Sequence, residues 1–348
     1  MSHADPRLAL ILEWLQHDVG LGVERVEPAS SDASFRRYFR VFHPRGTLVV
    51  MDAPPPHEDV RPYLAVSRML ESLDVHVPRV HEWDEARGLV LLEDLGSTAY
   101  LSRLQDGGDP DRLYGDALDA LARIQARGAE AASALPPYDR DVLMREMALM
   151  PEWFCERHLD LELTAAERGL VAAAFETLVR AALEEPRVFV HRDYHSRNLM
   201  VAEPRNPGVI DFQDALCGPI GYDLASLLKD CYIGWPRARA LQWLEGFRGR
   251  LEAQGARSVP SGAALVRGFD LIGVQRHLKV LGIFARLWHR DGKVRYLSDL
   301  PLTLRYLLET CALYPELGEL GRFLARRAAP ELARANERAA AARRAAGE

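Results

Sequence analysis

Up to about residue 96, the chain alternates between amphipathic helical patterns and short apolar runs. Leu8, Ile11, Leu12 and Leu15 recur at helical spacing, which predicts a helix over residues 6–18. Runs rich in valine, phenylalanine and tyrosine, bounded by glycine and proline, predict strands. The first part is therefore expected to hold helices over residues 6–18 and 57–73, and strands over residues 23–26, 35–42, 46–52, 78–83 and 88–93.

From residue 97 onward, alanine and leucine recur with the helical period of about 3.6 residues. Glycine and proline at Asp106-Gly107-Gly108 and Pro136-Pro137 separate successive helices. The predicted helices cover residues 97–105, 110–128, 139–159, 164–184, 235–253, 261–290 and 301–313. The tail from residue 325 is rich in alanine and arginine with weak amphipathicity, so we expect a surface helix or disorder there.

The change of pattern predicts an α+β fold with two lobes. A small N-terminal lobe with an antiparallel sheet is expected over residues 1–96, and a larger, mostly helical lobe over residues 97–325. Residues 326–348 form the tail. The apolar run 89–92 leads into Glu93-Asp94-Leu95-Gly96, which we interpret as the hinge between the lobes.

Composition is that of an ordinary globular protein, since 48% of the 348 residues are hydrophobic and 27% are charged. A net charge of -6 argues against a nucleic-acid partner, because such partners favour a basic face. Four cysteines have no metal-like spacing and fit a reducing compartment. The sequence has neither a secretory signal pattern nor an apolar run of membrane-spanning length, so we expect a cytoplasmic enzyme.

The chemistry of the chain is concentrated between residues 188 and 212. Val188-Phe189-Val190 leads into a polar loop with His191, Asp193 and Asn198, and a later apolar run ends at Ile210-Asp211-Phe212. The spacing His-x-Asp-x-x-x-x-Asn, followed by Asp-Phe, is the pattern of the kinase catalytic loop and metal-binding loop.

Each residue type in this pattern has its own task. Asp193 is expected to accept the proton of the attacking hydroxyl, while Asn198 and Asp211 supply oxygen ligands to a Mg²⁺ ion that bridges the phosphates of ATP. Asp and Asn also cap turns, which is the structural alternative. Strand flanks on both sides and the correctly spaced Asp211 favour the catalytic interpretation.

Small polar residues between two predicted strands, at positions 30–34, are typical of a loop that covers phosphates, because backbone N–H groups must approach the ligand closely. The candidate nucleotide-binding residues here are Ser31, Ser34, Phe35 and Arg36. No Gly-x-Gly-x-x-Gly is present, so a plain hairpin turn is the alternative. In the hinge, backbone groups from Glu93 to Leu95 are candidates for contacting the adenine edge, and a simple linker is again the alternative.

One position departs from the kinase pattern. Kinases place a lysine near the end of the third strand to hold the α- and β-phosphates, but the corresponding residue here is Met51. Either Arg36 or Arg37 from the preceding loop replaces this lysine, or the predicted register is wrong. Glu58 or Glu71 of the next helix is the candidate partner for such a cation.

The order of sheet lobe, hinge, helical lobe, His191-Arg192-Asp193 loop and Ile210-Asp211-Phe212 resembles the aminoglycoside phosphotransferase and choline kinase superfamily. Eukaryotic protein kinases are less similar, because residues 211–213 read Asp-Phe-Gln. The chain looks closer still to the kinases that phosphorylate the anomeric hydroxyl of N-acetylmuramate and N-acetylglucosamine in peptidoglycan recycling. The segments that carry this similarity are residues 29–40, 49–56, 190–194, 211–215 and 273–286.

The resemblance implies a two-lobed, protein-kinase-like fold with a nucleotide-binding N-terminal lobe and a catalytic, substrate-binding C-terminal lobe. It also implies transfer of a phosphoryl group from ATP to the C1 hydroxyl of the sugar, giving the α-1-phosphate. A hemiacetal hydroxyl is more acidic than an ordinary alcohol, so a modest base such as Asp193 suffices.

The implied sugar pocket needs polar groups for hydroxyls, an aromatic face for the ring and a cation for the lactyl carboxylate of N-acetylmuramate. Its candidate residues are His195, Arg145, Glu146, Trp153, Arg276 and Lys279. Each also has a structural interpretation, as part of the core or of a solvated face. Asp223, at the start of a predicted helix, is expected to brace the catalytic loop rather than to react.

Two other functions stay open from the residues alone. The first is a kinase of the same fold with another acceptor, such as an aminoglycoside, homoserine, a choline-like amine or another sugar. The second is a pseudokinase that binds nucleotide without catalysis, which Met51 favours and the complete set of Asp193, Asn198 and Asp211 opposes. The expected partner is a small molecule, with no nucleic acid, membrane or obligate protein partner.

Overall fold

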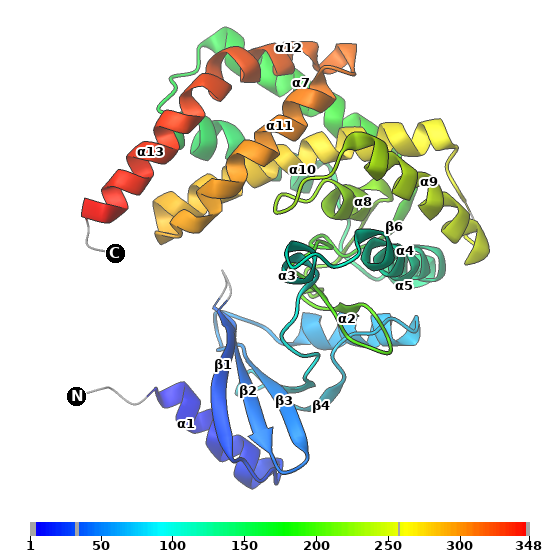
Figure 1. The fold of residues 1–348 in the computed structure, drawn as a ribbon, viewed down its shortest axis with the longest axis vertical. Coiled ribbons are helices and arrows are strands. Elements are labelled where there is room, and N and C mark those ends of the chain that lie inside the picture. Colours follow the sequence, from blue (N-terminus) through cyan, green and yellow to red (C-terminus); the bar gives the residue numbers. More distant parts are fainter. Residues whose placement is uncertain (1–4, 32–34, 257, 346–348) are drawn as a thin grey trace. The chain divides into compact units, whose positions relative to one another are not determined.

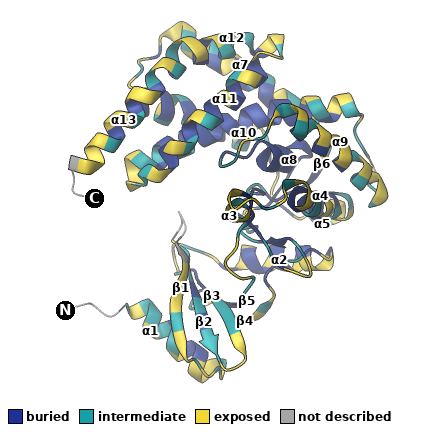
Figure 2. Cartoon of the chain, viewed as in Figure 1, coloured by how far each residue is buried: buried dark blue, intermediate teal, exposed yellow. Residues whose placement is uncertain are grey.

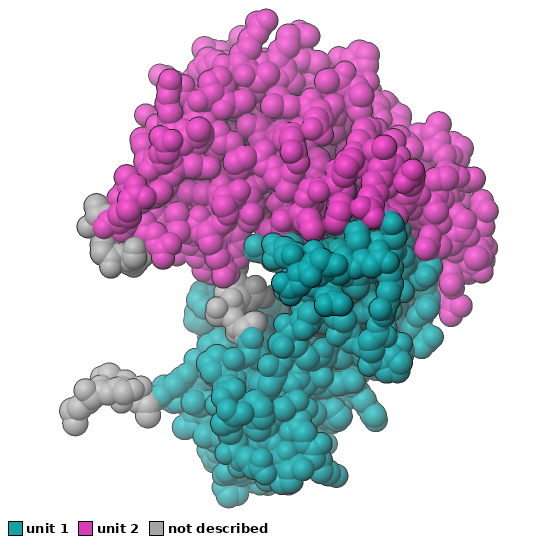
Figure 3. All heavy atoms as spheres, in the orientation of Figure 1, with its two compact units in different colours: residues 1–124, 197–215 teal, residues 125–196, 216–348 magenta. Residues whose placement is uncertain are grey.

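The computed structural model describes residues 5–31, 35–256 and 258–345. It consists of two compact units, one formed by residues 1–124 with 197–215 and the other by residues 125–196 with 216–348 (Figure 3). The chain passes from the second unit to the first between Ser196 and Arg197 and returns at Leu216. The polar loop that the sequence singles out as catalytic therefore contributes residues to both units.

The first unit is built on a five-stranded antiparallel sheet with the order β1-β2-β3-β5-β4 (Figure 1). Its strands are β1 (Arg25–Ser31), β2 (Arg37–His43), β3 (Gly46–Asp52), β4 (Val80–Asp84) and β5 (Leu89–Glu93). β3 and β5 lie inside the sheet, and their apolar runs are buried on both faces where the two strands pair. Continuous apolar runs rather than alternating ones are what a strand covered on both faces requires.

One face of this sheet is covered by α1 (Pro6–Glu13) and the π-helical turn Trp14–Asp18 that continues it. The cross-strand register places Phe39, Val50 and Leu91 side by side on this face. The buried cluster between helix and sheet comprises Ile11, Trp14, Leu15, Phe39, Val41, Val50, Leu89 and Leu91. The helical spacing of the apolar residues near the N-terminus thus finds its partner in the apolar face of the sheet.

The remaining elements of the first unit are α2 (Arg61–Ser72), α3 (Tyr100–Gln105), most of α4 (Pro110–Arg127) and the short hairpin of β7 (Leu199–Met200) and β8 (Gly208–Val209). Backbone hydrogen bonds attach the hairpin to its own unit. The N–H of Val201 donates to the carbonyl of Thr98 at 2.8 Å, and the N–H of Val209 donates to the carbonyl of His76 at 2.7 Å.

The second unit is mostly helical and is organised around α10 (Gly262–Asp291), which is buried along most of its length (Figure 2). The elements around it include α6 (Arg140–Met147), the π-helical segment Met150–His158, α7 (Ala165–Glu184), α8 (Gly221–Leu228), α9 (Arg237–Ala253) and α11 (Leu300–Cys311). The others are α5 (Ala129–Ala132), the two-stranded pair β6 (Arg187–Val190) and β9 (Leu216–Pro219), α12 (Gly318–Phe323) and α13 (Ala329–Ala345), with short 3-10 or π-helical turns at Val294–Asp299, Pro315–Leu317 and Leu324–Ala328.

The predicted fold class, an antiparallel sheet followed by a mostly helical part, is confirmed. The single helix predicted over residues 139–159 is wrong in detail, because α6 ends at Met147 and a π-helical segment follows. Pro151 explains the change, since proline lacks an N–H and clashes with the preceding helical turn. The tail is helical through α13, which buries Leu332 and Ala335.

The predicted lobe boundary after residue 96 does not coincide with the division into compact units, because α3 and most of α4 group with the sheet. As a division between nucleotide-binding and substrate-binding functions, the boundary stays a prediction. Among the helices of the described residues, none combines the length and apolar character needed to cross a lipid bilayer.

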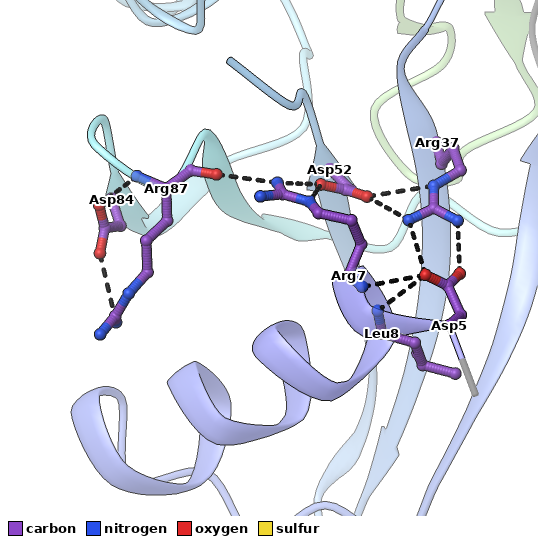
Figure 4. A network of polar contacts seen from close by, with 7 residues as sticks. All are labelled: Asp5, Arg7, Leu8, Arg37, Asp52, Asp84 and Arg87. Atoms are coloured by element: carbon purple, nitrogen blue, oxygen red, sulfur yellow. Dashed lines mark hydrogen bonds and ion pairs between the residues drawn. The ribbon is translucent and has the colours of Figure 1, made fainter. Parts of the chain in front are cut away.

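A buried carboxylate ties α1 to the end of β3 (Figure 4). The Asp52 side chain is fully buried and accepts hydrogen bonds from the guanidinium groups of Arg7 and Arg37, at 2.9 Å from Arg7 Nε and 2.7 Å from Arg37 Nη2. Arg7 also donates to the carbonyl of Arg87, at 2.8 Å, and Arg37 pairs with Asp5, the N-cap residue of α1. Both arginines point toward Asp52 in Figure 4, so this one side chain links three elements of the unit.

Substitution of Asp52 by asparagine is expected to lower the free energy of unfolding by about 2 kcal/mol. Removal of one member of a buried charged network leaves the others uncompensated, and partial exposure of Arg7 and Arg37 reduces the cost. Urea unfolding followed by circular dichroism measures the loss. Glu27→Gln, which removes an exposed pair with Arg25, is the control and should cost less than about 0.5 kcal/mol; equal effects of the two substitutions would contradict the prediction.

Candidate active site

The loop that carries Asp193 follows β6 and is held at both ends by buried carboxylates. Asp223, in the first turn of α8, accepts hydrogen bonds from the backbone N–H groups of His191 at 2.7 Å and Arg192 at 2.9 Å. Asp230, seven residues later, accepts from the backbone N–H of Ser196 at 3.0 Å and from its hydroxyl at 2.5 Å. The predicted bracing role of Asp223 is confirmed by these bonds. Asp230 was not singled out from the sequence.

The backbone of this loop adopts an unusual conformation. Arg192 has a positive φ of 82°, a backbone conformation that residues other than glycine rarely adopt. Such conformations persist where the surrounding structure fixes them, and they cluster at functional sites. The two hydrogen bonds to Asp223 fix the backbone on the N-terminal side of Asp193 and account for the tolerated strain.

Asp193 lies in a strongly cationic environment within the second unit. Its carboxylate is 3.8 Å from the guanidinium of Arg276, which comes from the middle of α10. Burial raises the pKa of Asp193, but Lys279, Arg276, His195 and Arg192 outweigh this effect and hold it well below its ordinary value. The side chain keeps 39% of its surface exposed. Asp193 is therefore an accessible and ionised carboxylate at neutral pH.

Glu146 is the second carboxylate of this cluster. It pairs with Arg192 and with Lys279 at 2.9 Å, and it accepts a hydrogen bond from the hydroxyl of Tyr138. Burial raises the pKa of Glu146, but the two cations and the Tyr138 hydroxyl lower it to a net value of about 2. Glu146 consequently stays charged and neutralises its cationic neighbours. Gln275 donates to the same carboxylate at 3.2 Å.

The residues predicted to bind the sugar take different positions. His195, Glu146, Arg276 and Lys279 are buried and gather around the catalytic loop. Arg145 is exposed on α6, and Trp153 is half-buried with the guanidinium of Arg157 lying 4.1 Å from its ring centre. The roles of all of these residues in sugar binding stay predictions.

The predicted metal ligands lie together in the first unit. The side-chain amide of Asn198 donates to the Asp211 carboxylate at 3.2 Å. The backbone carbonyl of Asn198 accepts a hydrogen bond from the backbone N–H of Ile210 at 3.1 Å. Gln213 donates to the other oxygen of Asp211 at 2.8 Å, and Phe212 packs on Tyr63 of α2. Asp211 has a positive φ of 64°. An amide oxygen and a carboxylate side by side fit Mg²⁺, which usually takes one or two carboxylates and fills its other positions with phosphate oxygens and water.

The strand that lacks the kinase lysine is placed as predicted. β3 spans Gly46–Asp52, and Met51, paired with Tyr38 and Val90, is 1% exposed. The strand bounds are confirmed, and whether Met51 occupies the position of the kinase lysine stays a prediction. An apolar thioether fits this position because the side chain is almost fully buried, whereas a lysine would need a buried anionic partner.

Arg36, from the predicted phosphate loop, lies near enough to the predicted metal ligand Asp211 to interact with it electrostatically. Its guanidinium lies 3.6 Å from Glu58 and 3.8 Å from Asp214. Burial lowers the pKa of Arg36, but Tyr38, Asp211, Glu58 and Asp214 raise it by more than this, so the net shift is upward. Of the two predicted carboxylate partners, Glu58 makes this contact. Arg37 instead pairs with Asp5 and Asp52.

The other predicted nucleotide residues are placed as follows. Phe35 is 65% exposed and stacks on His57, with 4.9 Å between the ring centres. Ser31 ends β1 opposite Arg37, and Ser34 lies outside the described residues. Glu93 is the last residue of β5, and its backbone N–H donates to the carbonyl of Arg79. The side chain of Leu95 lies against Gly208 of β8.

Comparison with known proteins gives consistent results. A family model described as the phosphotransferase enzyme family matches residues 25–260. The N-acetylmuramate/N-acetylglucosamine kinase of Pseudomonas aeruginosa is 51% identical over 298 residues, which cover 86% of this chain and 87% of the relative. The proteins of the same name from Pseudomonas putida and Neisseria meningitidis are 44% and 43% identical, over 93% and 84% of this chain and 98% and 87% of the relatives.

Solved structures agree on the fold. An ADP-bound aminoglycoside phosphotransferase has a TM-score of 0.59 at 15% identity, covering 87% of this chain and 98% of its own. An ethanolamine kinase from Plasmodium vivax has a TM-score of 0.61 at 13% identity, covering 91% of both chains.

Replacement of Asp223 by asparagine is expected to lower the free energy of unfolding by about 2–3 kcal/mol, because the amide nitrogen cannot accept and one of the two buried backbone donors loses its acceptor. The loop should also lose its fixed conformation, so kcat of any reaction that uses Asp193 should fall. Thermal or urea unfolding and steady-state kinetics measure the two effects. The matched control is Asp139→Asn, which keeps a good N-cap residue on α6 and should leave both stability and turnover nearly unchanged. Normal stability and turnover of the Asp223 variant would refute the bracing role.

Proposed function

We propose that this chain, which belongs to the phosphotransferase enzyme family, transfers the γ-phosphoryl group of ATP to the C1 hydroxyl of N-acetylmuramate and of N-acetylglucosamine. The family match over residues 25–260 and relatives at 43–51% identity that are named N-acetylmuramate/N-acetylglucosamine kinase support the proposal. They also confirm the predicted resemblance to the aminoglycoside phosphotransferase and choline kinase superfamily and to its sugar-kinase branch. The product is the sugar α-1-phosphate, which a recycling route for cell-wall sugars would use.

The observation that carries the mechanism is the ionised, accessible Asp193 on a loop that buried carboxylates hold at both ends. In the proposed reaction the C1 oxygen attacks the γ-phosphorus, the bond from that phosphorus to the β-γ bridging oxygen breaks, and Asp193 takes the hydroxyl proton. Positioning and charge compensation supply most of the catalysis in phosphoryl transfer. A rigid loop is therefore worth more here than a strong base.

ATP and Mg²⁺ are part of the same proposal. Asn198 and Asp211 would hold Mg²⁺, which supplies charge compensation on the phosphates. Arg36, which lies beside Glu58, would take over the role of the lysine that kinases have where this chain has the buried Met51. Phe35, Ser31 and Ser34 of the loop and the backbone from Glu93 to Leu95 remain the candidates for the rest of the nucleotide. A cytoplasmic location, where ATP is available, belongs to the proposal as well.

Asp193→Asn is expected to lower kcat by about three orders of magnitude or more, with little change in KM for either substrate, because the amide cannot accept the proton. Incubation with ATP, Mg²⁺ and N-acetylmuramate, followed by phosphorus NMR of the sugar 1-phosphate, measures product directly. Asp59→Asn removes an exposed carboxylate from the first unit and serves as the control. Phosphorylation only at another hydroxyl would overturn the proposed function, whereas normal turnover of the Asp193 variant would overturn only the role of this residue.

Asp211→Asn is expected to raise the Mg²⁺ concentration needed for half-maximal turnover at least about tenfold, because a neutral amide is a weaker ligand for a hard divalent cation. Titration of Mg²⁺ at saturating ATP measures this shift. Asp214→Asn is a nearby comparison that removes a carboxylate 3.8 Å from Arg36 without touching Asp211, and it should act mainly on KM for ATP. An unchanged Mg²⁺ requirement in the Asp211 variant would remove Asp211 from the metal site.

A further inference from the structure

The face of α10 that carries Arg276 continues toward the C-terminal end of the helix with further cations. Arg276, Lys279, Ile283 and Arg286 are separated by three, four and three residues, so they share one face of the helix. Arg276 and Lys279 are buried, whereas Ile283 and Arg286 are half-buried. This face therefore emerges from the core in the direction of Arg286, starting from the neighbourhood of Asp193.

The two inner cations of this face already have carboxylates within the protein. The Lys279 ammonium is 2.9 Å from Glu146 and donates to the Tyr222 hydroxyl at 3.1 Å. The Arg276 guanidinium faces Asp193 at 3.8 Å and donates to the Arg192 carbonyl at 3.4 Å. Both are among the cations that the sequence alone suggests for the sugar pocket, but each compensates a charge of the catalytic cluster. A sugar carboxylate bound there would compete with Glu146 or with Asp193.

Arg286 differs from both. Among the described residues, no ion pair or hydrogen bond to this side chain is found, and its Nε is buried without a hydrogen-bond partner. The carboxylates near enough to affect it are engaged elsewhere, since Asp291 pairs with Arg290 at 2.7 Å and Glu152 pairs with Arg157 at 3.2 Å. Burial lowers the pKa of Arg286 and Arg290 lowers it further, whereas the pKa of Arg276 is raised.

A partly desolvated guanidinium without an acceptor is unfavourable in the free protein, and an arriving carboxylate would relieve this cost with charge-assisted hydrogen bonds. Helical side chains tilt toward the N-terminus of their helix, which for Arg286 is the direction of Lys279 and Arg276 on the same face. The position is thus suited to an anionic group carried at some distance from the reacting hydroxyl. Of the two proposed sugars, only N-acetylmuramate carries such a group.

We propose that Arg286 binds the lactyl carboxylate of N-acetylmuramate and so determines how strongly the enzyme prefers this sugar over N-acetylglucosamine, an inference that rests on the proposed function. Binding of the carboxylate by Arg286 leaves Glu146 and Asp193 paired with their own cations. The residue acts on the ground-state affinity for one substrate and takes no part in the transfer of the phosphoryl group.

The test compares Arg286→Met with the unaltered enzyme on both sugars, with N-acetylglucosamine as the reference substrate that lacks the carboxylate. We expect KM for N-acetylmuramate to rise about 10- to 100-fold with little change in kcat, as for the loss of a hydrogen-bonded charge pair. The ratio of kcat/KM between the sugars should fall by the same factor. Arg286→Lys keeps the charge without the planar fork and should recover part of the ratio.

A substrate-side control completes the experiment. The methyl ester of N-acetylmuramate has no charge at the lactyl group, so it should bind the unaltered enzyme as weakly as the acid binds the methionine variant. In that variant, acid and ester should bind alike. Arg290→Met, at an exposed residue paired with Asp291, is the matched control on the protein side and should leave the ratio unchanged.

An unchanged sugar ratio in Arg286→Met, or equal losses on both sugars, would overturn this inference and leave the proposed function intact. If the unaltered enzyme phosphorylates neither sugar, the proposed function fails and the inference fails with it. Turnover of N-acetylglucosamine by Arg286→Met also shows that the variant is folded. A selective loss of activity on N-acetylmuramate is then not explained by misfolding.

Discussion

The site in the second unit depends on buried carboxylates that accept hydrogen bonds from the backbone of one loop. A loop has backbone N–H groups that no helix or sheet satisfies, and these must find acceptors if the loop is to be buried and fixed. Asp223 and Asp230 supply the acceptors at the two ends of the loop. Both lie on or just after α8, and α8 packs on α10. The position of Asp193 relative to Arg276 is therefore set by the packing of two helices rather than by the loop itself.

The charges around Asp193 agree with the chemistry that we propose. A carboxylate whose pKa is held low by neighbouring cations is a weak base, and it would be poorly matched to an ordinary alcohol. A hemiacetal hydroxyl is more acidic and needs less from its base. Glu146 pairs with Lys279 and Arg192, and both cations also lower the pKa of Asp193. The cluster thus keeps Asp193 ionised while it leaves 39% of the side chain open to an acceptor.

Local patterns in the sequence were sufficient for much of this molecule. The strand β3 could be placed because its apolar run is buried on both faces. Asp223 stood out because it begins a predicted helix, although its hydrogen bonds go to a loop about thirty residues earlier and not to its own helix. The end of α6 was missed, since the helical period continues past it and Pro151 acts on the preceding turn. Lys279 and Arg286 look alike in sequence and differ only in what packs beside them. Glu146, which distinguishes them, comes from a helix more than a hundred residues earlier.

The buried Met51 has a consequence for chemical biology. A reagent that acylates the amine of a lysine would find none at this position, because a thioether cannot be acylated in this way. The proposed substitute, Arg36, stays protonated at any physiological pH and is not a nucleophile toward acyl groups. Activity-based probes of that design should pass over this enzyme, and covalent inhibitors would have to be aimed at a different side chain.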